Sequence, residues 1–81
     1  MNQADVIQRL QKIFDDIFLD APTLTPELTA KDVPEWTSLI HISLLVAVEQ
    51  EFQVRFRVGE VEATRNVGEF ADLIARRASE K

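Results

Sequence analysis

The chain has 81 residues, of which 46% are hydrophobic and 28% charged, so we expect one folded domain over residues 1–81 with no room for a catalytic cleft of its own. It contains no cysteine and one histidine, which excludes disulfides and thiolate chemistry and leads us to assign no metal. The net charge of −5 argues against nucleic acid as a partner, because affinity for a phosphate backbone comes mainly from Lys and Arg.

An amphipathic helix is expected from Asp5 to about Phe18, capped near Asn2 or Asp5. Its apolar residues start at Val6 and Leu10 and recur at positions i, i+4, i+7 and i+11, the spacing of one helix face. No apolar run approaches the roughly 20 residues that a bilayer crossing needs. We therefore expect a cytoplasmic protein that does not insert into membranes.

A long ordered loop is expected from Asp20 to Thr37. Proline removes a backbone donor and disfavours helix in the residue before it, and this stretch contains three, namely Pro22, Pro26 and Pro34. A loop of this length needs a function or its own apolar anchors. The candidate anchors are Leu24, Leu28, Val33 and Trp36.

The second helix is expected from Ser38 to about Phe52 and has two separable apolar rows. One row consists of Leu44, Leu45, Val48 and Phe52, with His41 near its middle. The other row consists of Leu39, Ile42 and Val46. One row is enough to face the core of a small bundle, so we expect the second to face a partner, the alternative being a central helix buried on most sides.

The last part of the chain starts with a short extended link, in which Val54 and Phe56 point inward, and one or two helical turns between Gly59 and Thr64. The final helix is expected to be capped by Asn66, with Glu69 completing a capping-box-like arrangement. Its buried stripe is Val67, Phe70, Leu73 and Ile74. The predicted fold is therefore all-α, a four-helix bundle with three longer helices, one short helix and a long loop after the first helix.

This order of elements and several motifs resemble the acyl carrier protein family. The strongest match is the segment Glu35-Trp36-Thr37-Ser38-Leu39-Ile40-His41-Ile42, followed by Val48-Glu49-Gln50-Glu51-Phe52. It is similar to the Trp-Asp-Ser-Leu segment and apolar helix of many carriers. Val67-Gly68-Glu69-Phe70 also resembles the opening of the family's last helix, so the likeness extends over most of the chain from Leu19 onward.

The resemblance implies that Ser38 is the attachment site of a covalent 4′-phosphopantetheine arm. A separate phosphopantetheinyl transferase would attach the arm, and acyl-transferring or condensing enzymes would then act on its thioester cargo. The thiol would belong to the arm, which suits a chain without cysteine. We expect a monomeric, non-enzymatic carrier in a specialised fatty-acid, polyketide or related pathway.

The residues expected to contact partners are Thr37, Leu39, Ile42, Val46 and Glu49. Thr37 stands where the family usually has Asp, and it can still cap the helix, although it lacks the charge that would attract a basic transferase. Recognition should therefore depend more on the apolar row. His41 could lie at the mouth of a cargo pocket, or simply pack against its neighbours.

Other readings of the same residues remain open. Ser38 could be no more than a helix N-cap, in which case the chain would be an unmodified protein-interaction module that keeps the carrier fold. An aminoacyl or peptidyl carrier is a further alternative, because the sequence does not identify the cargo. A small enzyme using Ser38 and His41 is a poor reading, since no third orienting group is apparent.

Overall fold

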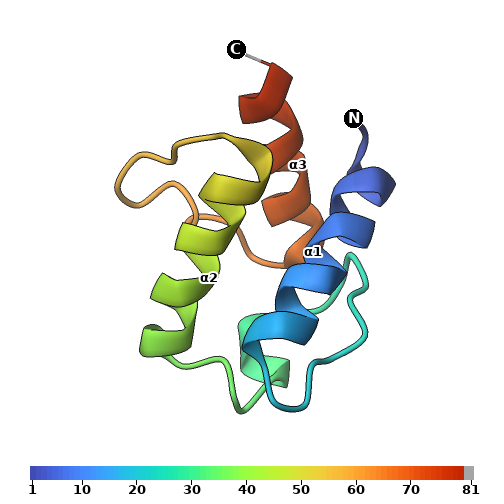
Figure 1. The fold of residues 1–81 in the computed structure, drawn as a ribbon, viewed down its shortest axis with the longest axis vertical. Coiled ribbons are helices and arrows are strands. Elements are labelled where there is room, and N and C mark those ends of the chain that lie inside the picture. Colours follow the sequence, from blue (N-terminus) through green and yellow to red (C-terminus); the bar gives the residue numbers. More distant parts are fainter. Residues whose placement is uncertain (80–81) are drawn as a thin grey trace.

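The computed structural model describes residues 1–79, and these form a bundle of three long helices and one short one. The helices are α1 (Gln3–Ile17), the 3-10 helix η1 (Ala30–Asp32), α2 (Ser38–Phe52) and α3 (Val67–Ser79). In Figure 1, α1 runs antiparallel to both α2 and α3, and it packs against both. No strand occurs among residues 1–79, and the predicted all-α fold is confirmed.

Helix α1 begins two residues earlier than the apolar pattern suggested, because Asn2 caps it. The Asn2 side chain accepts a hydrogen bond from Asp5 N at 2.9 Å, and the Asp5 carboxylate accepts one from Asn2 N at 3.3 Å. This reciprocal arrangement satisfies backbone donors that the first turn leaves unpaired. None of the helices within residues 1–79 has the length and hydropathy needed to cross a membrane.

The core lies where the three long helices meet. Each helix contributes one apolar stripe, and the loops add several anchors. The buried hydrophobic residues are Val6, Leu10, Ile13, Phe14, Phe18, Leu24, Val33, Leu44, Val48, Phe52, Val54, Val61, Val67, Phe70, Ala71, Leu73 and Ile74. The apolar residues predicted to face the core from the first and last helices are therefore largely buried.

The loop between α1 and α2 is ordered by apolar anchors and by contacts with the start of α3. Leu24 and Val33 are buried, and the Trp36 ring packs edge-on against Phe14 at 5.2 Å. The Gly68 N–H donates to the Pro26 carbonyl at 2.9 Å. A Cβ on Gly68 would lie 3.0 Å from that carbonyl oxygen, so glycine allows a closer approach than a larger residue would.

The segment between α2 and α3 starts with a left-handed residue, Gln53, at φ 54°. The expected helical turns after Gly59 are present as hydrogen-bonded turns, including one bond from Ala63 N to Gly59 O at 3.1 Å. They do not form a regular helix. Gly59, the first residue of the expected helical segment, has φ 82°, in the left-handed region that glycine adopts readily.

The start of α3 is capped by Asn66, as predicted, through a hydrogen bond from Glu69 N to the Asn66 side chain at 2.8 Å. The Glu69 carboxylate, however, accepts from Arg65 N at 2.9 Å instead of closing the box on Asn66. Near the other end of α3, the Arg77 guanidinium forms a half-buried ion pair with Glu60. This pair ties residues 59–64, which we call the turn segment, to the last helix.

Candidate functional site

Ser38 is the first residue of α2 and is exposed to solvent. The residue that caps the helix is its neighbour Thr37, whose hydroxyl oxygen accepts a hydrogen bond from Ile40 N at 3.3 Å. Within residues 1–79 the Ser38 hydroxyl makes no hydrogen bond. Ser38 is therefore not the N-cap of α2, because Thr37 occupies that position.

The surroundings of Ser38 suit an anion. The first N–H groups of a helix lack intrahelical partners, and the helix dipole places partial positive charge at this end. The first turn of α2 contains no acidic residue. A phosphodiester on the Ser38 oxygen would thus lie at a favourable helix terminus.

An open hollow of about 390 Å³ lies beside Ser38. It is formed by the start of α2, the end of the preceding loop, η1 and the turn segment before α3. Its lining residues are Ala30, Trp36, Thr37, Ser38, His41, Ile42 and Glu62. The serine thus lies at the edge of a concave surface.

A chain of hydrogen bonds crosses this hollow through His41. The indole N–H of Trp36 donates to His41 Nδ1 at 3.1 Å, and His41 Nε2 lies 3.1 Å from a carboxylate oxygen of Glu62. Because the indole is a donor only, Nδ1 must be the acceptor, so the network assigns the proton of the neutral ring to Nε2, which donates to Glu62. Both ring nitrogens are occupied, and neither is directed to Ser38 as a general base.

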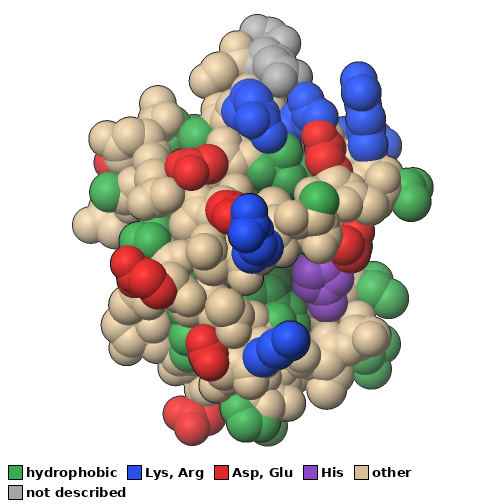
Figure 2. Space-filling model, turned by 180° about the vertical axis from the view of Figure 1, so that it is seen from behind, with side chains coloured by type: hydrophobic (Ala, Val, Ile, Leu, Met, Phe, Trp, Pro, Cys, Tyr) green, Lys and Arg blue, Asp and Glu red, His purple; other side chains and the backbone are tan. Residues whose placement is uncertain are grey.

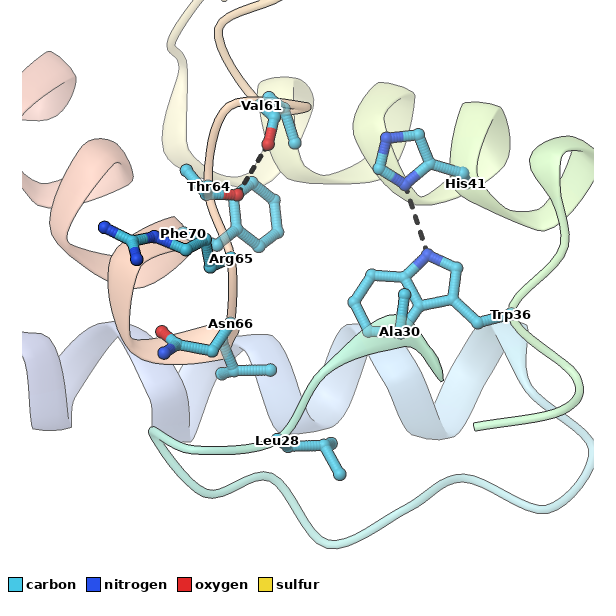
Figure 3. Close-up of a pocket in the computed structure, with 10 residues that line it drawn as sticks. Leu28, Ala30, Trp36, His41, Val61, Thr64, Arg65, Asn66 and Phe70 are labelled. Carbon is cyan, nitrogen blue, oxygen red and sulfur yellow. Dashed lines mark hydrogen bonds between the residues drawn. The ribbon is translucent and has the colours of Figure 1, made fainter. Parts of the chain in front are cut away.

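A second, smaller hollow of about 90 Å³ lies deeper between the loop, the turn segment and the start of α3 (Figure 3). It shares Ala30, Trp36 and His41 with the open hollow. Its other lining residues are Leu28, Val61, Thr64, Arg65, Asn66, Val67 and Phe70. His41 lines both hollows, and it is packed against Trp36 and hydrogen-bonded to it.

The two apolar rows of α2 are separated as expected. Leu44, Val48 and Phe52 are buried in the core, whereas Leu45 is half-buried. The second row is exposed, with 74% of Leu39, 61% of Ile42 and 49% of Val46 accessible to solvent. This row starts next to Ser38 and follows α2 toward its C-terminal end.

Glu49 differs from the other residues expected to contact partners. Its carboxylate accepts a hydrogen bond from Phe56 N at 2.9 Å, and the side chain is half-buried. The structure thus gives Glu49 a role in holding the segment after α2.

The sequence did not point to Glu62 as part of the site. Glu62 lies 21 residues from His41, so no local spacing signals their contact.

The arrangement has counterparts among known proteins, although no family model matches the chain. It is 28% identical over 75 residues to an acyl carrier protein of Thermosynechococcus vestitus, covering 91% of this chain and 93% of that protein. A solution NMR structure of a holo acyl carrier protein from Geobacter metallireducens matches with a TM-score of 0.84 and 34% identity. That match covers 93% of this chain and 87% of the other. The chain belongs to the acyl carrier protein family.

Proposed function

We propose that this chain is a carrier protein that bears acyl intermediates as thioesters on a 4′-phosphopantetheine arm attached to Ser38. The observation that carries the proposal is that the Ser38 hydroxyl is accessible and, in the described part of the chain, unbonded. It is exposed at the first position of α2, and its hydroxyl is left free of hydrogen bonds within residues 1–79 because Thr37 caps the helix. A transferase could therefore reach the hydroxyl without disturbing the fold.

The residues around Ser38 fit such an arm. The unpaired N–H groups of the first turn favour the negative charge of a phosphodiester, and the open hollow gives an attached chain a surface to lie on. When bound, the arm supplies the thiol that forms the thioester, which a chain without cysteine cannot provide. The protein's own residues position the arm and present a surface to partners.

The structure gives little support to catalysis by Ser38 and His41. A nucleophilic serine needs a base within hydrogen-bond reach, and both nitrogens of His41 are engaged by Trp36 and Glu62. Delivery of cargo to other proteins is the better explanation. The exposed row of Leu39, Ile42 and Val46 provides an apolar contact surface adjacent to Ser38 for a transferase and for acyl-transferring or condensing enzymes.

A thiol titration tests the proposal, because the chain itself has no cysteine. The purified protein is incubated with coenzyme A, Mg²⁺ and a broad-specificity phosphopantetheinyl transferase, freed of small molecules and treated with a thiol reagent. We expect one thiol per chain in the parent. Ser43→Ala is a matched control, since Ser43 is also exposed on α2, and it should give the same result.

Ser38→Ala should give no thiol. If the parent also gives none with several transferases, an unmodified interaction module becomes the better account of the fold. If Ser38→Ala gains a thiol as well, the arm is attached elsewhere and the assignment to Ser38 is wrong.

A further inference from the structure

We propose that the exposed row of α2 continues into an arginine-bearing loop, and that together they form a docking surface for a partner whose apolar contact face is flanked by carboxylates. We call residues 55–58 the arginine loop; they are Arg55, Phe56, Arg57 and Val58. The proposal rests on the carrier function, because it specifies the kind of partner to which a carrier would deliver. Its basis is the charge and placement of this loop.

The arginine loop directs its charges outward, because burial alternates along residues 54–57. Side chains of an extended segment alternate between its two faces. Val54 is buried and Phe56 is half-buried against Phe70, with ring centroids 6.0 Å apart, whereas Arg55 and Arg57 are exposed. Because Val54 and Phe56 face the core, Arg55 and Arg57 face the solvent.

Several contacts hold the loop in place. Glu49 accepts a hydrogen bond from Phe56 N, and Glu60 accepts one from Arg57 N, both at 2.9 Å. Glu60 is in turn paired with Arg77 of α3. In Figure 1 the segment after α2 projects from the side of the bundle beside that helix. A surface fixed in this way loses little conformational entropy on binding.

The acidic residues near the loop are already engaged within the chain. Glu51 is paired with Arg9 at 2.8 Å, and Glu60 with Arg77. Arg65, next to the start of α3, is balanced by Glu69 at 3.6 Å. Further engaged acids are Glu49, which binds Phe56 N, and Glu62, which binds His41.

No such partner balances the two loop arginines. None of the ion pairs found within residues 1–79 includes Arg55 or Arg57. Although residues 1–54 carry nine acidic against three basic residues, residues 55–81 carry five against six. Figure 2 shows Lys and Arg side chains gathered toward the end of the molecule where the chain terminates. The arginine loop is thus a locally basic segment of a chain whose net charge is −5.

The apolar row and the arginine loop are parts of one surface. A shallow groove of about 260 Å³ joins them, and its lining residues are Val46, Glu49, Gln50, Val54 and Arg55. Val46 is the last member of the exposed row. Beyond Arg55, the Val58 side chain is completely exposed at the tip of the loop. A partner that follows α2 from Ser38 would thus meet apolar contacts first and guanidinium groups at the far end.

Charge complementarity selects the occupant. Guanidinium groups form their strongest contacts with carboxylates, and apolar side chains of the row would be covered by apolar side chains of the partner. A partner with Lys or Arg at the corresponding positions would face like charges. The surface thus favours a protein whose apolar contact face is bordered by Asp or Glu.

Two synthetic helical peptides with the same leucine row test this proposal, one flanked by Glu and the other by Lys. Each is titrated into the full chain while backbone amide shifts are followed by NMR. We expect the Glu peptide to bind more tightly and to shift amides of both the apolar row and residues 55–58. A net charge of −5 acting alone would make the Lys peptide bind more tightly, so tighter binding of the Glu peptide distinguishes a local effect of the arginine loop from the overall charge.

The variant Arg55→Gln/Arg57→Gln should weaken binding of the Glu peptide by about three- to tenfold, the size expected for two exposed charge pairs. The double variant Lys12→Gln/Arg76→Gln is the matched control, because it removes the same total charge from exposed positions elsewhere. Its effect should stay below about twofold if the contacts are local. Raising the salt concentration should reduce the difference between the two peptides.

Tighter binding of the Lys peptide, shifts that leave residues 55–58 unchanged, or no binding of either peptide would overturn the proposal. Concentration-dependent sedimentation without peptide, lost in Arg55→Gln/Arg57→Gln, would instead identify a second copy of the chain as the occupant. The test does not need the arm, so it is run in parallel on Ser38→Ala. Failure of Ser38 loading with intact Glu-peptide binding would refute the carrier function alone.

Discussion

The indole N–H of Trp36 donates to Nδ1 of His41, joining the end of the long loop to the first turns of α2. The same indole packs against Phe14 and Phe18 of the first helix and its C-cap. Trp36 therefore anchors the loop, as expected, and also fixes the imidazole beside Ser38. The ring is oriented by contacts that lie outside its own helix.

This relationship predicts the tautomer of His41. Since Nδ1 accepts from Trp36, we expect the neutral ring to carry its proton on Nε2, which ¹⁵N chemical shifts of the imidazole can determine. Trp36→Phe removes the donor and should destabilise the fold by about 1 kcal/mol or somewhat more. Chemical denaturation measures the loss, and a neutral ring found protonated on Nδ1 in the parent would contradict the network.

The two rows of α2 should respond differently to the same truncation. Leu44 is completely buried, so Leu44→Ala should cost about 2–5 kcal/mol of unfolding free energy. Leu39 is 74% exposed, and Leu39→Ala should change stability by about 0.5 kcal/mol or less. Urea denaturation of both variants tests the assignment. Equal losses would mean that both rows are buried in solution.

Gln53 occupies a left-handed conformation at the end of α2, which glycine adopts at lower cost. Gln53→Gly should therefore stabilise the protein by about 0.5–1 kcal/mol, because relief of a left-handed cost of about 1–2 kcal/mol exceeds the entropy that glycine adds to the unfolded chain. Gln50→Gly is the matched control, because Gln50 is exposed inside the helix, where glycine should cost about 1 kcal/mol. Thermal unfolding of the pair should give shifts of opposite sign. Shifts of the same sign would contradict the assigned end of the helix.

Thr37 caps α2 and stands next to the proposed attachment site. Thr37→Ala should lower stability by about 1 kcal/mol through loss of the cap. Thr37→Asp keeps a capping oxygen and adds a negative charge at the helix start, so it should raise stability by about 0.3–1 kcal/mol. We also expect it to accelerate loading of Ser38 by a transferase with a basic contact face. Slower loading of Thr37→Asp would show that the threonine is itself recognised.

The helices could be predicted from the sequence because their apolar spacing and caps are local signals. Ser38 stood out in the same way, through its motif and its place at a helix start. The contact between His41 and Glu62 could not be predicted, since it depends on how the turn segment folds back over α2. The hydrogen bond that Glu49 accepts from Phe56 N could not be predicted either, because the two residues are seven positions apart and the bond depends on how the chain turns after α2.

The short helix expected after Gly59 does not form as a regular helix. The residues from Gly59 to Thr64 are numerous enough for a helical turn, and hydrogen-bonded turns do form there. The sequence leaves the backbone conformation of Gly59 open, because glycine adopts either sign of φ, and here it is left-handed. A segment this short forms few intrahelical hydrogen bonds, so helix propensity alone does not decide whether it becomes a regular helix.

The most direct measurement is the intact mass of the chain after incubation with coenzyme A, Mg²⁺ and a phosphopantetheinyl transferase. The carrier account predicts that the parent and Ser43→Ala each gain the mass of one phosphopantetheine arm, while Ser38→Ala gains nothing. Fragmentation of the modified protein should place the added mass on Ser38. An unchanged parent mass with several transferases, or an equal gain in Ser38→Ala, would contradict the account.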